Sequence, residues 1–157
     1  MQLSEQWVLV TGGARGLGRS ITRALAREGA GVVINYLHSD AAAQALAEEL
    51  GPRALALQAD VTDAAAVQRL FAQVRERTGQ PISAVVNNAL AQFRFDGDAR
   101  PQIGDITWQR FAQQLEGAVK GALNTTQAAL PAMREPGFGR ILNVATTLFQ
   151  NPGVPYH

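Results

Sequence analysis

The stretch that decides the fold of this chain is residues 8–25, which reads VLVTGGARGLGRSITRAL. It starts as the apolar run 8–10 and breaks at a glycine-rich turn over residues 11–18. An apolar side chain then recurs every four residues, at Leu17, Ile21 and Leu25. A continuous apolar run followed by a four-residue repeat predicts a buried strand, a glycine turn and an amphipathic helix in direct succession.

The glycine turn is the first candidate binding site. Glycine lets the backbone come close to a pyrophosphate, and the start of the following helix supplies free N–H groups and the positive end of the helix dipole. A glycine-rich string is also compatible with an ordinary tight turn. The predicted strand before it and the predicted helix after it favour the phosphate site.

The composition predicts one globular domain. The chain has 157 residues, of which 46% are hydrophobic and 17% are charged, and this suits a single core. A formal net charge of +1 without a basic run argues against nucleic acid or an anionic membrane as partner. The absence of cysteine excludes disulfides and thiolate metal sites. We see neither a signal peptide nor an apolar run of about 18 residues, so we expect a cytoplasmic protein.

Further apolar runs alternate with helical patterns along the rest of the chain. The runs 32–34, 54–57, 82–86 and 141–144 predict four more strands, and Ser39, Asp63 and Thr107 are expected to begin the helices between them. This alternation predicts an α/β fold with a Rossmann-like, doubly wound parallel sheet. We expect one domain over residues 1–157, incomplete at its C-terminus.

The ends of the second and third predicted strands carry candidate nucleotide contacts. In a dinucleotide fold, a carboxylate at the end of the second strand holds the ribose 2′-hydroxyl of NAD. Here Asn35 and Tyr36 stand at that place, and the next carboxylate is Asp40. Because a carboxylate would repel a 2′-phosphate, its absence favours NADP over NAD. Asp60 and Val61, just past the third strand, are candidates to meet the adenine, although Asp60 is also explained as a helix cap.

The spacing of the glycine turn resembles a family motif. Thr11-Gly12-x-x-x-Gly16-x-Gly18 is similar to the T-G-x-x-x-G-x-G motif of the short-chain dehydrogenase/reductase family. The resemblance implies hydride transfer between NAD(P)H and a carbonyl or alcohol, and strand order 3-2-1-4-5 for the part of the sheet present. It implies cofactor contacts from Gly12, Arg15, Gly16, Leu17 and Gly18. Family members that prefer NADPH often carry a basic residue where Arg15 stands, and a solvated loop arginine is the alternative.

Two further segments carry the resemblance. Asp60 and Val61 match the pair that lines the family's adenine pocket. Asn87-Asn88-Ala89 is similar to the family's N-N-A-G, with Leu90 in place of the glycine. The resemblance implies that Asn87 and Ala89 form the wall beside the cofactor. Two asparagines at a strand end are also compatible with simple turn chemistry.

The part of the chain that corresponds to the family's catalytic residues resembles the family less closely. In a predicted helix over 107–133, the apolar residues Phe111, Leu115, Ala118, Ala122 and Ala129 recur at three-to-four spacing. Ala118 stands where the family has an asparagine that supports a proton-relay water. Aligning 139–141 with the family's G-R-I places Thr146 on the catalytic serine, and a threonine hydroxyl can donate the same hydrogen bond to a carbonyl. Threonine at a strand end also occurs without any function.

The family's general acid is the tyrosine of Tyr-x-x-x-Lys. Neither Tyr36 nor Tyr156 has a lysine four residues later, and family spacing puts the pair just past His157. The resemblance therefore covers the N-terminal part of a 3-oxoacyl-acyl-carrier-protein reductase-like enzyme, truncated after the fifth strand and inactive alone. Its expected substrate is a small carbonyl or acyl-carrier compound, and the whole protein is expected as a homodimer or homotetramer. The alternatives are a non-catalytic nucleotide-binding or regulatory domain and a partner-binding α/β domain without ligand.

Overall fold

The computed structural model describes residues 1–90 and 103–145. Its strands form one sheet in the order β3-β2-β1-β4-β5, and all pairings are parallel. The strands are β1 (Trp7–Val10), β2 (Gly31–Tyr36), β3 (Ala54–Gln58), β4 (Ala84–Asn87) and β5 (Arg140–Asn143). The predicted fold class is confirmed, because five parallel strands joined by helices make the doubly wound arrangement.

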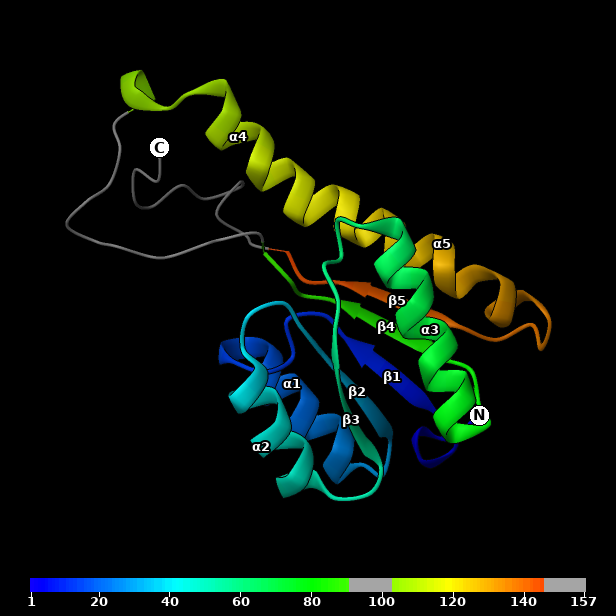
Figure 1. Cartoon of the computed structure of the whole chain (residues 1–157). Coiled ribbons are helices and arrows are strands. Elements are labelled where there is room, and N and C mark those ends of the chain that lie inside the picture. The colour runs from blue at the N-terminus through cyan, green and yellow to red at the C-terminus, as the bar shows by residue number, and fades with distance from the viewer. Residues whose placement is uncertain (91–102, 146–157) are drawn as a thin grey trace.

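Helices cover both faces of the sheet (Figure 1). One layer holds α1 (Gly16–Arg27) and α2 (Asp40–Leu50), and the other holds α3 (Ala64–Thr78) and α5 (Gly121–Arg134). The helix α4 (Trp108–Leu115) continues into α5 through a π-helical turn at Glu116–Lys120, and short 3₁₀ turns lie at Leu3–Glu5 and Ile103–Asp105. No helix within the described ranges is long and apolar enough to cross a membrane.

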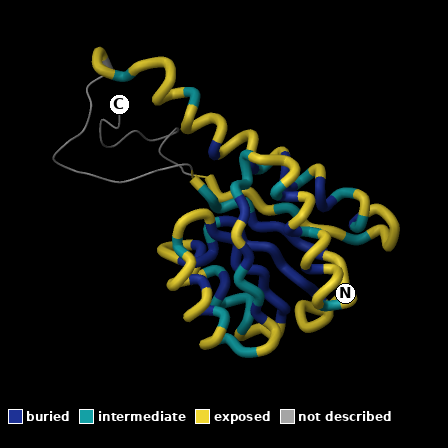
Figure 2. The backbone as a smooth tube through the Cα atoms, in the orientation of Figure 1, coloured by how far each residue is buried: buried dark blue, intermediate teal, exposed yellow. Residues whose placement is uncertain are grey.

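The sheet separates two hydrophobic cores. Val8, Val10 and Ile34 pack toward the layer of α1 and α2, whereas Leu9 and Val33 pack with buried side chains of α3 and α5. Alternate residues of each strand point to opposite faces, so a sheet between two helix layers needs apolar residues at every position. This explains the continuous apolar runs in the sequence and the buried centre of the molecule (Figure 2).

The apolar face of α1 differs from the predicted one. Leu17 is 59% exposed, while Ile21 and Leu25 pack partly buried against the core. The buried residues of α1 are Gly18 and Thr22. The helix begins pressed against the glycine turn, which leaves Leu17 outside the core and on the wall of the groove described below.

The long helix over 107–133 is confirmed, with a π-helical interruption that the sequence did not predict. Thr107 caps it by accepting a hydrogen bond from the Arg110 N–H at 3.3 Å. Phe111 and Leu115 are exposed, so the predicted apolar face is wrong in this part. A π-helical turn holds more residues than an α-helical turn, and it changes which face points inward. The buried residues lie beyond Leu115: Gly117, Gly121, Asn124, Thr125, Ala128, Ala129 and Met133.

Candidate cofactor site

Two adjoining cavities open at the carboxyl edge of the sheet. The larger is a groove of about 1360 Å³, and the smaller is a cavity of about 270 Å³ between the ends of β4 and β5 and the π-helical turn. Ligands of doubly wound sheets bind at this edge, where the strand order reverses. Here the reversal lies between β1 and β4. The two cavities share Val61, Asn88, Ala89, Leu90, Gly117 and Val144 as walls.

The structure brings the predicted cofactor residues together around these cavities. The groove is lined by Gly12, Arg15, Gly16, Leu17, Gly18, Asn35, Tyr36, Asp60, Val61 and Ala89. Asn87 lines the smaller cavity. The predicted catalytic residue Thr146 lies outside the described residues. The direct contacts of all these residues with a ligand remain predictions.

The glycine turn has the shape of a phosphate cradle. Gly12 and Gly16 adopt positive φ angles of 63° and 53°, which favour glycine. A Cβ on Gly18 would lie 2.2 Å from the Gly12 carbonyl oxygen, so any side chain there would displace the turn. A Cβ on Gly16 would meet no atom within 4 Å, and the turn therefore faces open space at the start of α1. These residues fit a dinucleotide pyrophosphate.

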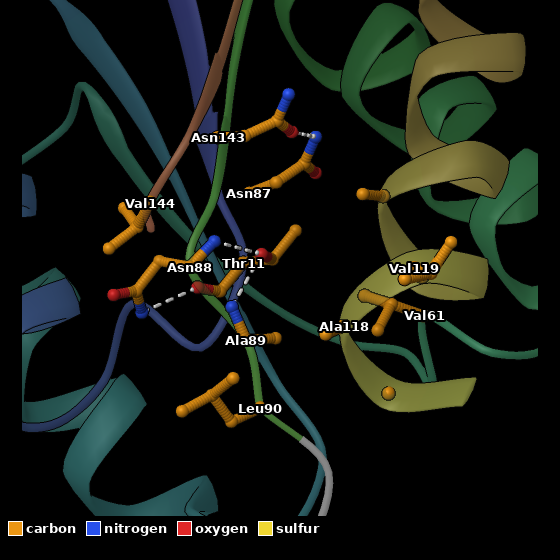
Figure 3. Close-up of a pocket in the computed structure, with 13 residues that line it drawn as sticks. Thr11, Val61, Asn87, Asn88, Ala89, Leu90, Ala118, Val119, Asn143 and Val144 are labelled. Carbon is orange, nitrogen blue, oxygen red and sulfur yellow. Dashed lines mark hydrogen bonds between the residues drawn. The ribbon is translucent and has the colours of Figure 1, made fainter. Parts of the chain in front are cut away.

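Thr11 joins this cradle to β4, a role that the sequence interpretation missed. Its hydroxyl donates to the Val86 carbonyl at 3.3 Å and accepts from the N–H groups of Asn88 and Ala89 at 2.9 and 3.0 Å. The Asn88 side chain donates in return to the Thr11 carbonyl at 3.0 Å (Figure 3). The threonine of the T-G motif was the available signal, since its hydroxyl can satisfy several partners at once.

The end of β2 is polar and contributes no carboxylate to the groove wall, where the carboxylates are Asp60 and Glu116. Tyr36 donates its hydroxyl to the Asp40 carboxylate, which raises the pKa of Tyr36, and burial adds to the shift. Asp40 is not among the residues that line the groove, whereas Arg15 and Ser39 are. Within residues 1–90 and 103–145, Arg15 makes no ion pair. Ser39 is the N-cap residue of α2, but its side chain makes no capping bond.

The loop after β3 is held by the Asn35 amide and by an internal turn. Asn35 is 2% exposed, and its Nδ2 donates to the Ala59 carbonyl at 3.0 Å. Asp60 accepts from the N–H and the hydroxyl of Thr62, both at 2.8 Å. Asp63, not Asp60, caps α3. Asn35 therefore shapes the groove through the loop backbone, a contact that the sequence interpretation missed.

Two asparagines that line the smaller cavity, Asn87 and Asn143, belong to a chain of hydrogen bonds. The Thr125 hydroxyl donates to Asn87 Oδ1 at 2.6 Å. Asn87 Nδ2 donates in turn to Asn143 Oδ1 at 2.9 Å (Figure 3). Asn143 was missed in the sequence, although its position at a strand end was an available signal. Leu90, at the position of the family's glycine, is 58% exposed and borders both cavities.

Comparison with known proteins agrees with this geometry. A family model described as short chain dehydrogenase matches residues 6–155, and the chain belongs to this family. It is 40% identical over 147 residues to sorbitol dehydrogenase of Cereibacter sphaeroides. It is also 34% identical over 151 residues to 3-oxoacyl-[acyl-carrier-protein] reductase FabG of Staphylococcus aureus, and 32% identical over 159 residues to versicolorin reductase 1 of Aspergillus parasiticus.

The chain spans little more than half the length of these relatives. The three alignments cover 93%, 92% and 99% of this chain but 54%, 58% and 57% of the respective relatives. Proteins of this family use a nicotinamide cofactor, NAD or NADP, which agrees with the cradle at the glycine turn.

Proposed function

We propose that the protein is an NADP-preferring oxidoreductase that interconverts a small ketone, of the 3-oxoacyl type, and the corresponding secondary alcohol. The observation that carries the cofactor preference is the wall at the end of β2, where Arg15 and Ser39 line the groove and Asp40 does not. A phosphate group carries close to two negative charges near neutral pH, so it favours a guanidinium and a free hydroxyl over a carboxylate.

The described residues have distinct roles in this proposal. The backbone of the glycine turn and the start of α1 hold the pyrophosphate, because Gly16 faces open space and Gly18 permits close approach. Asp60 and Val61 border the adenine, while Asn87 and Ala89 form the wall at the nicotinamide end. NADPH supplies the hydride when bound. Thr146 is proposed to donate a hydrogen bond to the substrate carbonyl oxygen.

Residues 1–157 are proposed to form one cofactor-binding domain, and the whole protein is proposed to be a homodimer or homotetramer. The helix α4 and the π-helical turn support self-association, because they expose Trp108, Phe111, Leu115 and Val119 at 75%, 53%, 45% and 61%. A contiguous exposed apolar surface typically marks an interface. Sedimentation of the protein from its complete reading frame would test this, and a monomer at micromolar concentration would exclude it.

The test of function uses the same full-length protein. NADPH oxidation would be followed with a 3-oxoacyl thioester, and NADP⁺ and NAD⁺ reduction with sorbitol. We expect NADPH-dependent reduction of the thioester, with NADH less effective. If only sorbitol were turned over, the proposed substrate would be a polyol and not a 3-oxoacyl compound. NADPH binding without any turnover would favour the non-catalytic nucleotide-binding protein, and no binding of either cofactor would refute the proposal.

A further inference from the structure

Val61 is a wall of both cavities, and it is held by α5. Its side chain packs on Gly121, where an added Cβ would lie 2.7 Å from Val61 Cγ2. One turn further along α5, Asn124 Nδ2 donates to the Val61 carbonyl oxygen at 2.8 Å. Asn124 is 8% exposed and lines neither cavity. The amide is therefore directed at the loop and not at a ligand.

The loop is clamped from two sides. Asn35 of β2 holds the Ala59 carbonyl, and Asn124 of α5 holds the Val61 carbonyl. Asp60 lies between these two points, with its own carboxylate occupied by the turn to Thr62. A carbonyl that loses its donor in a buried setting carries a desolvation cost, so the loop stays where both amides can reach it. The position of α5 thereby sets the position of the 60–61 wall.

The neighbouring residue of α5 acts on the other side of the site. Thr125 donates to Asn87, which donates to Asn143 at the end of β5. Consecutive residues of one helix thus reach the loop at the adenosine end and the strand ends at the nicotinamide end. The contacts of Asn124 and Thr125 are separate, so a change at Asn124 is expected to act on one end of the groove.

We propose that Asn124 is a positioning residue for the adenosine end of the cofactor. Through the Val61 carbonyl it fixes the 60–61 loop, and this loop forms the groove wall that faces the adenosine. The inference rests on the proposed NADP function. It predicts that loss of the Asn124 amide weakens binding of the adenosine part of the cofactor and leaves binding of the nicotinamide part unchanged.

The experiment uses Asn124→Leu and Asn124→Asp in the protein from its complete reading frame, at pH 8. Leucine is of similar size and has no donor, and an aspartate carboxylate only accepts hydrogen bonds. Bound NADPH, followed by its fluorescence, is displaced either with adenosine 2′,5′-diphosphate or with nicotinamide mononucleotide. For the adenosine fragment we expect the displacement constant to rise roughly fivefold to tenfold, the worth of about one hydrogen bond. For the mononucleotide we expect no change.

Gln127→Leu is the matched control, because Gln127 is an exposed amide one turn further along α5. We expect it to change neither constant. Urea unfolding identifies a variant that does not fold, and the ratio of the two constants is then taken from the other variant. If both fragments bound more weakly by the same factor, Asn124 would have a purely structural role and the inference would be overturned. Displacement constants equal to those of the wild-type protein would overturn it as well. A wild-type protein that binds neither NADPH nor NADH would overturn the proposed function as well.

Discussion

The two sides of the groove differ in how completely this chain buries them. We call β1, β2 and β3 with α1, α2 and the glycine turn the nucleotide half, and β5 with α4 and the π-helical turn the reaction half. Every residue of β1 and β2 is buried. No residue of β5 is buried, and Leu142 and Val144 are 50% and 42% exposed.

The difference follows from the position of the strands. β1 and β2 each pair on both sides, whereas β5 pairs only with β4 among the described strands. The cofactor cradle depends on contacts within the nucleotide half and on the Thr11 bonds to β4. The reaction half instead presents apolar side chains on its surface, where further protein surface can pack. The regions that the proposed function assigns to cofactor binding and to substrate chemistry are thus packed to different degrees.

The largest expected effect is a difference in unfolding free energy between the same substitution made in each half. Leu9 is 1% exposed in β1 and Leu142 is 50% exposed in β5. Leu9→Ala should lower the free energy of unfolding by about 3 kcal/mol, because it leaves a cavity in a closed core. Leu142→Ala should lower it by less than about 1 kcal/mol. Urea denaturation of both variants measures the difference, and equal losses would mean that β5 is covered in the full protein.

The next effect concerns the cradle itself. Gly18→Ala places a Cβ 2.2 Å from the Gly12 carbonyl oxygen, and relieving that overlap should weaken NADPH binding by about a hundredfold. Gly104→Ala is the matched control, because an added Cβ there meets no atom within 4 Å. A fluorescence titration with NADPH measures the affinity of both variants. Near-normal binding by Gly18→Ala would show that the turn adjusts, and the nucleotide half would be less rigid than its packing indicates.

A smaller effect tests the cofactor preference. Arg15→Ala removes the guanidinium from the groove wall, and we expect NADPH affinity to fall about tenfold, since a charge-assisted contact with phosphate is lost. NADH affinity should not change. Arg19→Ala removes an arginine of α1 that is paired with Glu49 at 3.7 Å, and it should affect neither cofactor. A parallel loss of NADPH and NADH affinity would assign Arg15 to the pyrophosphate and remove the argument for NADP.

The smallest effect concerns Tyr36. Tyr36→Phe removes the bond to Asp40 and should cost about 1 kcal/mol of unfolding free energy at pH 7. The folded state holds the phenol proton more tightly than the unfolded state, because the pKa of Tyr36 is raised. This contribution is present in full below the unfolded pKa, about 10, and is lost as the pH rises through the folded pKa. Unfolding curves at neutral and alkaline pH test this, and a pH-independent difference would contradict it.

Much of the nucleotide half could be predicted from residues close in sequence. The turn needs glycine at Gly12 and Gly16 for their positive φ angles and at Gly18 for the close approach of the Gly12 carbonyl oxygen. The buried strands follow from apolar runs. The face of the helix over 107–133 could not be predicted in this way. Its apolar spacing at Phe111 and Leu115 indicates one stripe, and the π-helical turn at Glu116–Lys120 directs other residues inward. The turn was not evident from residue spacing alone.

The sequence by itself determined the family motif, the order of strands and helices, and several of the residues that line the groove, because each depends on local conformation and on the rule that parallel strands end at one edge. Only the tertiary structure decided which polar side chains meet across the fold. Asn124 reaches Val61 and Thr125 reaches Asn87 over 63 and 38 residues of chain. Such contacts depend on how the helix layer is rotated against the sheet, and that rotation is set by packing.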